Sequence, residues 1–282
     1  MSEAIEQPPM KKGLSGTALR VATVVPLIPI IVWMMFAGPR LLWQTFILAA
    51  IAIGGYELMG MTVASSRRLR VWGSMTSVLF AYTLMFTTSA SAVYGSVLII
   101  IVGAMAWSLL QDDPLHNASA RVGWLLGAPV YVGGTLTALA LVRDFDPTGA
   151  WVLMTMVLAW GSDTSAYFVG RKFGKTKLAP RISPKKTLEG SAAGLAAAVV
   201  GAVIMSFFFL PGLDPIDAIA LGILGGAAGQ AGDLLVSVLK RSSGVKDSGG
   251  ILPGHGGILD RVDALAFTAP ATWAYGHFIA GF

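Results

Sequence analysis

Stretches of about 17 to 25 apolar residues follow one another along this chain, and no other feature restricts its fold as strongly. A run of that length can cross a bilayer as a helix, because the helix satisfies its own backbone hydrogen bonds in lipid. The runs lie near residues 21–38, 41–63, 71–87, 90–110, 122–142, 150–169, 190–210, 216–236 and 263–281. We therefore predict an all-α, polytopic integral membrane protein with about nine transmembrane helices.

The composition agrees with this fold class. Hydrophobic residues make up 55% of the chain and charged residues only 12%, whereas soluble proteins have roughly 25% charged residues. The absence of cysteine excludes disulfides and cysteine-based metal sites. We divide the chain into a polar tail (1–17), N-terminal transmembrane helices (18–149) and a C-terminal catalytic region (150–282) with polar loops at 170–189 and 240–262.

The basic residues predict an orientation in the membrane. In a soluble protein, a net charge of +5 would raise the question of nucleic acid as a partner. With alternating loops and a cytoplasmic N-terminus, all but Arg40 and Arg143 of the 20 Lys and Arg residues fall on the cytoplasmic side. Such an excess is typical of cytoplasmic loops in membrane proteins. We therefore predict a cytoplasmic N-terminus, two cytoplasmic polar loops and no nucleic-acid partner.

Carboxylates within or near the apolar runs are rare, and by this topology all of them lie toward the cytoplasmic side. They are Glu57, Asp163, Glu189, Asp233, Asp260 and Asp263. An ionisable group in a membrane segment is a functional hypothesis by default. On a helix, Asp233 shares one face with Ser237 and Lys240. Aspartates from different helices suit an oxygen-ligated cation such as Mg²⁺; the alternative is that each acid only pairs with a neighbouring Lys or Arg.

The polar loop at 170–189 ends in the sequence SPKKTLEGS. Ser183 and Pro184 are suited to cap and start a helix there. Lys185 and Lys186 would then lie beside a helix N-terminus, where free N–H groups attract phosphate, with Glu189 on the same first turn. The pattern indicates an anion site beside an acid. The basic residues earlier in this loop are explained equally by membrane orientation alone.

The segment GVKDSGGILPGHGG, residues 244–257, is rich in glycine. Glycine lets the backbone approach a ligand closely and offers N–H groups to phosphate. The alternative is a flexible loop, but flexibility alone does not require Lys246, Asp247 and His255 among the glycines. For His255, a phosphate contact and a structural hydrogen bond both remain open.

Small residues recur along the eighth apolar run at Gly222, Gly225, Gly226, Gly229 and Gly232. This spacing predicts close packing against neighbouring helices in preference to ligand binding.

The segment from Ser237 to Asp263, SVLKRSSGVKDSGGILPGHGGILDRVD, resembles the signature of the phosphatidate cytidylyltransferases, or CDP-diacylglycerol synthases. It follows the pattern S-x-x-K-R-x4-K-D and then H-G-G-x-x-D-R-x-D without departure. SPKKTLEG and the upstream DTSAYFVGRKFG are also similar to motifs of that family. These motifs lie between residues 163 and 263, whereas the N-terminal half agrees only in its several apolar runs and a glutamate in the second.

The resemblance implies that CTP and phosphatidate react with the help of Mg²⁺ to give CDP-diacylglycerol and pyrophosphate. A phosphate oxygen of phosphatidate would attack the α-phosphorus of CTP. Because the second pKa of a phosphate monoester is about 6, this oxygen is largely deprotonated at neutral pH. Metal, positive charge and in-line positioning therefore matter more than a strong general base.

This chemistry gives each candidate site residue an expected role. Lys240, Arg241 and Lys246 would hold phosphates of CTP or lipid, and Lys185, Lys186 and Thr187 another phosphate or the lipid head group. We assign to catalysis Asp233, Lys240, Arg241, Lys246, Asp247, His255, Asp260, Arg261 and Asp263. We assign to substrate binding Ser183, Lys185, Lys186, Thr187, Glu189, Ser237, Gly256 and Gly257. The expected metal ligands are Asp233 and Asp260 first, and then Asp263 and Asp247. Asp163 is expected at the metal as well, in a supporting position together with Glu189.

Other functions remain as alternatives at this stage. One is a related CTP-dependent membrane enzyme that acts on another lipid phosphate or phosphorylates a polyprenol. Another is a transporter, although transporters place polar residues near the bilayer midplane and often show two related halves. By analogy we expect a bacterial inner membrane, an active site facing the cytoplasm, and CTP, phosphatidic acid and membrane lipids as partners. The oligomeric state is left open, a homodimer included.

Overall fold

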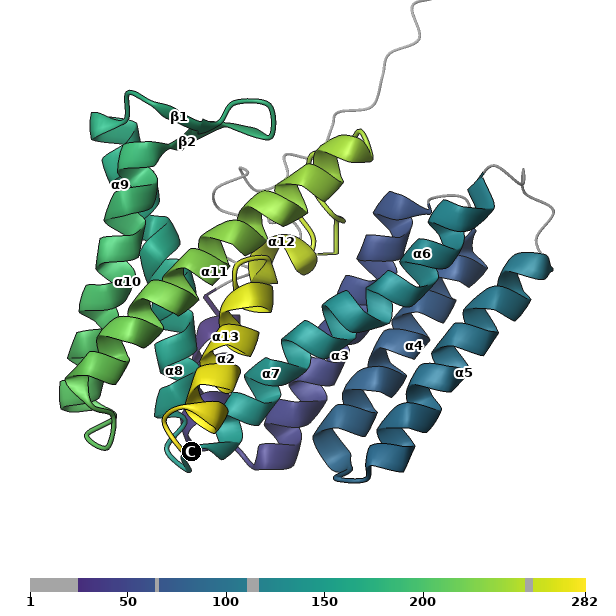
Figure 1. The fold of residues 1–282 in the computed structure, drawn as a ribbon, viewed down its shortest axis with the longest axis horizontal. Helices are drawn as coiled ribbons and strands as arrows, with labels where there is room; N and C mark the ends of the chain where they lie inside the picture. Colours follow the sequence, from purple (N-terminus) through teal and green to yellow (C-terminus); the bar gives the residue numbers. More distant parts are fainter. Residues whose placement is uncertain (1–24, 64–65, 111–116, 252–255) are drawn as a thin grey trace, which may run out of the picture.

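The computed structural model describes residues 25–63, 66–110, 117–251 and 256–282, and helices make up most of this part of the chain (Figure 1). The first helices are α2 (Leu27–Phe36), α3 (Arg40–Thr62), α4 (Arg67–Phe86) and α5 (Ala90–Leu109). A continuous helical stretch follows, formed by α6 (Ala118–Ala128), the π-helix η2 (Pro129–Gly134), α7 (Thr135–Leu141) and the short η3 (Val142–Asp144). Another is formed by α8 (Ala150–Met156), the π-helix η4 (Val157–Gly161) and α9 (Ser162–Phe173). The remaining elements are β1 (Lys177–Ala179), β2 (Ser183–Thr187), α10 (Leu188–Phe208), α11 (Pro215–Ser242), α12 (Leu259–Val262) and α13 (Leu265–Phe278).

The helices agree with the fold class predicted from the apolar runs, each of which coincides with helical structure in the described residues. In this part of the chain, five helices are long and apolar enough to cross a membrane: Arg40–Thr62, Ala90–Leu109, Ala118–Asp144, Leu188–Phe208 and Pro215–Ser242. Large apolar side chains on α5 stay exposed, among them Ile99 at 58% and Val102 at 62%, as suits a surface that faces lipid. The chain is therefore a multi-pass, helical membrane protein. The total of nine spans and the cytoplasmic N-terminus stay predictions.

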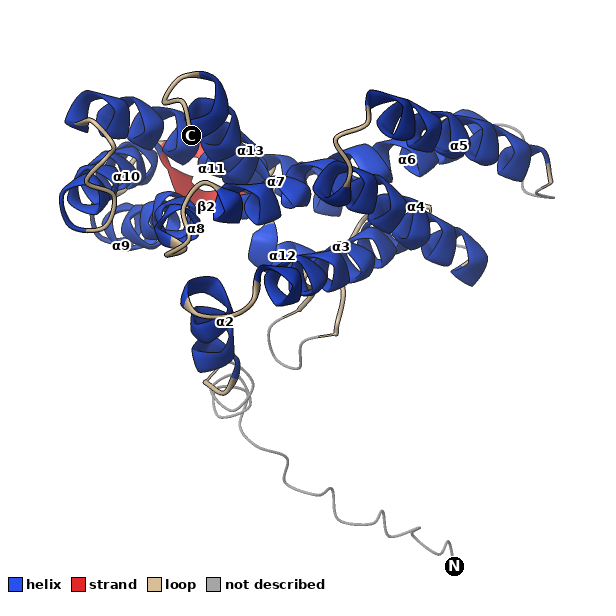
Figure 2. Ribbon diagram, turned by 90° about the horizontal axis from the view of Figure 1, so that it is seen from below, coloured by secondary structure: helices blue, strands red, loops and turns tan. Residues whose placement is uncertain are grey.

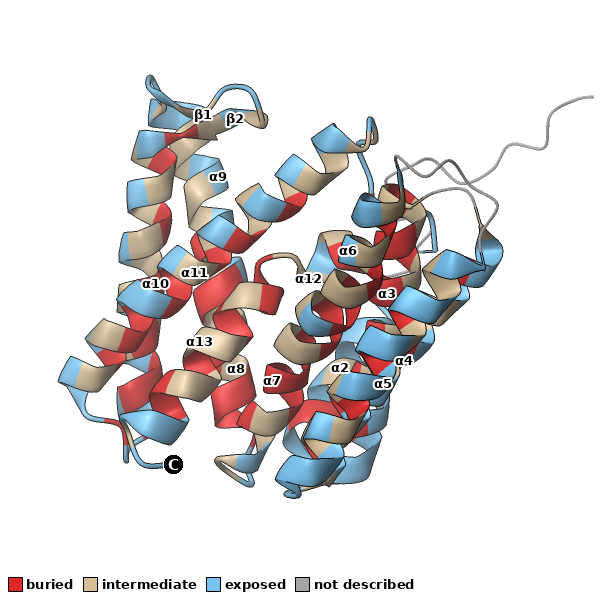
Figure 3. Cartoon of the chain, turned by 45° about the vertical axis from the view of Figure 1, so that its right-hand side comes forward, coloured by how far each residue is buried: buried red, intermediate tan, exposed pale blue. Residues whose placement is uncertain are grey.

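The helices form two groups with a shared centre. One group contains α3, α4, α5 and α6, and the other contains α8, α9, α10 and α11, with α7 and α13 between them (Figures 1 and 2). Buried residues concentrate on the central helices α7, α8 and α13 (Figure 3). The β1–β2 hairpin and the C-terminal end of α11 lie at the same end of the molecule, opposite the chain's C-terminus (Figure 1).

Helix α11 packs closely against two neighbours, as its glycine spacing predicted. A Cβ at Gly226 would come within 2.7 Å of the Cβ of Ala198 on α10. A Cβ at Gly232 would come within 2.7 Å of the Asp263 carbonyl oxygen. Because small residues let helix backbones approach, the glycines bring Asp233 close to the segment that carries Asp263. The helix also continues to Ser242, so Ser237, Lys240 and Arg241 are helical and not part of a loop.

The helix start predicted at Ser183 and Pro184 is wrong. These residues begin strand β2, which pairs antiparallel with β1 so that Lys177 lies opposite Thr187 and Ala179 opposite Ser183. The cross-strand hydrogen bonds satisfy the backbone of this segment, so no helix is needed there. Helix α10 begins at Leu188 instead, and the Thr187 hydroxyl caps it by accepting a hydrogen bond from the Gly190 N–H at 3.2 Å.

Candidate active site

A cavity of about 630 Å³ lies between α9, the β1–β2 hairpin, the start of α10 and the middle of α11. Its lining includes four cationic side chains, Arg171, Lys177, Lys185 and Lys186. It also includes two carboxylates, Asp163 and Asp233, together with Tyr167, Thr187, Ser191 and Gln230. Four cationic side chains beside two carboxylates suit the binding of a polyanion such as a nucleoside triphosphate.

An ion pair joins the hairpin to α11 inside this cavity. The Lys186 ammonium lies 2.5 Å from Asp233 Oδ2, and the two side chains are 25% and 17% exposed. The Ser237 hydroxyl donates to Asp233 Oδ1 at 3.4 Å, which confirms that Asp233 and Ser237 share a helix face. Asp233 is thus paired with a lysine, as the simpler interpretation of the acids anticipated.

A second ion pair lies further along the same face of α11. The Lys240 ammonium donates to Asp260 Oδ1 at 2.7 Å, and these side chains are only 13% and 7% exposed. Asp260 Oδ2 accepts three more hydrogen bonds, from the Ser248 N–H at 2.7 Å, the Ser248 hydroxyl at 3.0 Å and the Gly257 N–H at 3.1 Å. Asp260 therefore holds the two described ends of the glycine-rich segment together.

The protonation of Asp260 follows from these contacts. Burial by itself would raise the pKa of the carboxyl, because it disfavours the charged form. Hydrogen bonds from the Lys240 ammonium and from two backbone N–H groups outweigh the burial, so the pKa of Asp260 lies below its ordinary value. The carboxylate is therefore ionised at neutral pH, and its charge is balanced mainly by Lys240.

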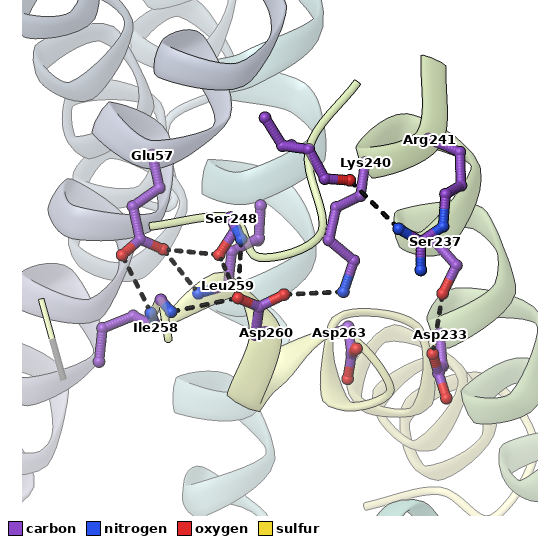
Figure 4. Close-up of polar contacts among 12 residues, drawn as sticks. Glu57, Asp233, Ser237, Lys240, Arg241, Ser248, Ile258, Leu259, Asp260 and Asp263 are labelled. Atoms are coloured by element: carbon purple, nitrogen blue, oxygen red, sulfur yellow. Dashed lines mark hydrogen bonds and ion pairs between the residues drawn. The ribbon is translucent and has the colours of Figure 1, made fainter. Parts of the chain in front are cut away.

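Asp263 lies near both ion pairs. It follows α12 directly, and Figure 4 shows its side chain between those of Lys240 and Asp233. The negative charges of Asp233 and Asp163 both act on it. Three carboxylates from α9, α11 and the α12–α13 junction thus lie within electrostatic reach of one another.

Glu57 is a site residue to which the sequence analysis assigned no role. It lies on α3, yet its carboxylate accepts hydrogen bonds from the Ile258 and Leu259 N–H groups at 3.1 and 2.9 Å, and from the Ser248 hydroxyl at 3.1 Å. The only sequence signal was an acid inside an apolar run, which must have polar partners. Nothing in the local sequence indicates that the partners lie near the other end of the chain.

Gln230 is a second residue that the sequence analysis missed. Its side-chain amide donates to the Ser191 carbonyl at 2.9 Å and to the Ser162 hydroxyl at 3.3 Å, and it accepts a hydrogen bond from the Ser191 hydroxyl. These bonds tie α9, α10 and α11 together at the wall of the cavity. The only indication of this residue in the sequence was a polar glutamine between Gly229 and Gly232 in an apolar run.

Several predicted site residues lie away from the cavity. The Glu189 carboxylate accepts hydrogen bonds from the Lys175 and Thr176 N–H groups, each at 3.1 Å at its shortest, and so secures the chain before β1. Arg241 contacts the carbonyls of Ile182 and Val245. Of the predicted site residues, Asp163, Lys185, Lys186, Thr187 and Asp233 line the cavity. Those outside its lining are Ser183, Glu189, Ser237, Lys240, Arg241, Lys246, Asp247, Gly256, Gly257, Asp260, Arg261 and Asp263, and His255 lies outside the described residues.

Similarity to known proteins extends over nearly the whole chain. The model of a family described as the cytidylyltransferase family matches residues 18–279. A protein of Brucella abortus biovar 1 named phosphatidate cytidylyltransferase is 33% identical over 95% of this chain and 96% of its own length. Proteins of the same name are 32% identical in Pseudomonas aeruginosa, over 91% of this chain and 97% of theirs, and 42% identical in Bacillus subtilis, over 53% and 56%.

Proposed function

This chain belongs to the cytidylyltransferase family, and we propose that it transfers the cytidylyl group of CTP to phosphatidate, giving CDP-diacylglycerol and pyrophosphate. The relatives named for this reaction match the chain nearly from end to end. The observation in the structure that carries the proposal is the cavity in which the hairpin lysines meet Asp163 and Asp233. The cavity offers several cations to the triphosphate of CTP. It also lies in a membrane protein, where the lipid phosphatidate is available as the second substrate.

The proposed reaction requires little proton transfer by side chains of the protein. A phosphate oxygen of phosphatidate forms a bond to the α-phosphorus of CTP, and the bond from that phosphorus to the pyrophosphate oxygen breaks. Because a phosphate monoester has a second pKa of about 6, the attacking oxygen needs no strong base. Lys177, Lys185, Lys186 and Arg171 would hold the triphosphate and stabilise the charge that develops on the leaving pyrophosphate.

Mg²⁺ is part of this proposal, and Asp233, Asp263 and Asp163 are the residues that would hold it. When bound, it would neutralise phosphate charge and align the attacking and leaving oxygens. Within the described ranges, no group of three or more His, Asp or Glu side chains is arranged to hold a metal by itself. Mg²⁺ does not require three protein ligands, because it commonly binds one or two carboxylates together with substrate phosphates and water. Asp163 and Asp233 line the same cavity and Asp263 lies near Asp233, and this gathering of acids supports a cation among them.

Asp260, expected from the sequence to be a metal ligand, has a different environment. Both of its oxygens already accept hydrogen bonds, four in all from Lys240, Ser248 and Gly257. An ion on Asp260 would have to share the carboxylate with these four donors, whereas Asp233 accepts, among the described residues, only from Lys186 and Ser237. We therefore place Asp233 and Asp263 before Asp260 among the proposed ligands.

The reaction is tested with purified protein in detergent, CTP labelled at the α-phosphate, phosphatidate and Mg²⁺. We expect label to enter CDP-diacylglycerol in the chloroform phase, and EDTA to abolish it, because the phosphate charge would no longer be neutralised. Label in another lipid when other acceptors are supplied, but none with phosphatidate, would favour a related CTP-dependent enzyme. Undiminished product in EDTA would remove Mg²⁺ from the proposal.

The orientation is also proposed: the cavity faces the cytoplasm of a bacterial inner membrane, where CTP is present. The hairpin and the turn between α10 and α11 lie at opposite ends of the molecule (Figure 1). The chain has no cysteine, so a cysteine introduced at either end is the only thiol that a maleimide can label. In sealed right-side-out vesicles, we expect a membrane-impermeant maleimide to label Gly212→Cys at once, but Arg181→Cys only after permeabilisation. Labelling in the reverse order would place the cavity on the outside.

A further inference from the structure

Glu57 is a buried acid in a helix that is otherwise apolar. It lies on α3, one of the helices long and apolar enough to cross a membrane, and only 5% of the residue is exposed. A carboxylate in such a place is costly unless hydrogen bonds or opposite charges compensate it. In the described structure, its compensation comes entirely from hydrogen bonds to the glycine-rich segment and the start of α12, from the opposite half of the chain.

The Glu57 carboxylate contacts the glycine-rich segment at Ser248 and the chain that directly follows this segment at Ile258 and Leu259. Oε1 accepts from the Ile258 N–H, and Oε2 accepts from the Leu259 N–H and from the Ser248 hydroxyl (Figure 4). A Cβ at Gly249 or Gly257 would overlap this carboxylate. The two glycines are therefore required for the backbone to approach Glu57 so closely.

Ser248 extends the contact from Glu57 to the proposed active site. Its hydroxyl lies 3.1 Å from Glu57 Oε2 and 3.0 Å from Asp260 Oδ2, so one hydroxyl serves two carboxylates. Asp260 in turn holds the Lys240 ammonium on α11. A continuous set of hydrogen bonds thus runs from α3 through Ser248 and Asp260 to the face of α11 that also carries Asp233 (Figure 4).

We propose that Glu57 is a positioning residue for the reaction: its carboxylate fixes the chain at Ser248 and at Ile258 and Leu259, and thereby places Asp260 and Lys240 beside Asp263. The inference rests on the proposed function for its effect on turnover, but its effect on the segment is independent of that function. It also gives the N-terminal helices a part in catalysis, although they do not line the cavity.

A carboxylate is the group that this arrangement requires. Three donors converge on Glu57, and both of its oxygens accept. In Glu57→Gln, one oxygen becomes an NH₂ group, which would face at least one backbone N–H and leave it unsatisfied. Glu57→Asp keeps both acceptors and the charge but is one methylene shorter, so it should retain part of the contacts.

The test measures turnover and local order in the same variants. For Glu57→Gln we expect the rate of CDP-diacylglycerol formation to fall roughly ten- to a hundredfold, the effect of losing a hydrogen bond to a charged group. We expect amide hydrogen exchange to accelerate in peptides that contain Ser248 or Ile258 and Leu259, but not across the other helices. Glu57→Asp should recover part of both. Asp217→Asn is the matched control, because Asp217 lies at the start of α11 and accepts from Tyr275 instead.

Ser248→Ala keeps the inference testable if Glu57→Gln fails to fold. It removes only the shared hydroxyl, and in the double variant with Glu57→Asp the two losses should be less than additive. Full turnover in Glu57→Gln, or unchanged exchange at Ile258 and Leu259, would overturn the inference. If the wild type makes no CDP-diacylglycerol, the proposed function fails, and the exchange experiment still decides whether Glu57 orders the segment.

Discussion

Replacing Asp233 with asparagine is expected to lower CDP-diacylglycerol formation by roughly a hundred- to a thousandfold, the size of effect seen when one charge-stabilising group is lost from an active site. Asp233 lines the cavity, pairs with Lys186 and acts electrostatically on Asp263. In the variant, Lys186 loses its counter-ion and the proposed Mg²⁺ loses a ligand. Both changes disturb the place where the triphosphate would bind.

The measurement for Asp233→Asn is the initial rate at limiting and at saturating Mg²⁺. A metal ligand predicts that the deficit is largest at limiting Mg²⁺ and shrinks as Mg²⁺ is raised. Asp217→Asn serves as the control, because it neutralises an acid on the same helix α11 at the opposite end, far from the cavity lining. Near-wild-type rates for Asp233→Asn at limiting Mg²⁺ would exclude Asp233 as a ligand.

Replacing Lys240 with methionine is expected to destabilise the fold by about 3–5 kcal/mol, because it leaves the Asp260 carboxylate buried without its partner. The two side chains are 13% and 7% exposed, so water cannot compensate the remaining charge. Methionine retains most of the apolar length of lysine, which limits the loss of packing. We expect the melting temperature in detergent to fall clearly and turnover to be lost with it.

A second substitution separates charge from function in this pair. In Lys240→Met with Asp260→Asn, no charge is left unpaired, so most of the lost stability should return. Turnover should not return, because Asp260 and Lys240 no longer hold the glycine-rich segment to α11. A single Lys240→Met variant as stable as the wild type would show that the ion pair is not buried as the structure describes. Recovery of turnover in the double variant would remove Lys240 from the proposed site.

The chain's helices and its family could both be predicted from the sequence. Apolar runs predicted the helices well because, in lipid, a backbone must satisfy its own hydrogen bonds, which is a local property. The signature between Ser237 and Asp263 indicated the family that the comparisons then confirmed. The glycine spacing of α11 also predicted its close packing, since small residues act through distance alone.

The arrangement of the site was harder to predict, because it depends on contacts between residues far apart in the chain. The sequence put Asp233 and Asp260 together as metal ligands, whereas the structure places them in two different ion pairs, with Lys186 and with Lys240. It predicted a helix at Ser183, where pairing with β1 produces a strand. No local pattern could reveal these partners, since each is set by how distant segments pack.

The sequence by itself determined that this protein is a helical membrane protein of the cytidylyltransferase family, because hydrophobic length and a contiguous signature are local properties of the chain. Only the tertiary structure decided that Glu57 on α3 supports the glycine-rich segment and that the hairpin lysines face Asp163 and Asp233. The physical reason is that a buried charge must find its partners wherever packing brings donors within hydrogen-bonding distance. For Glu57, those donors lie at residues 248, 258 and 259.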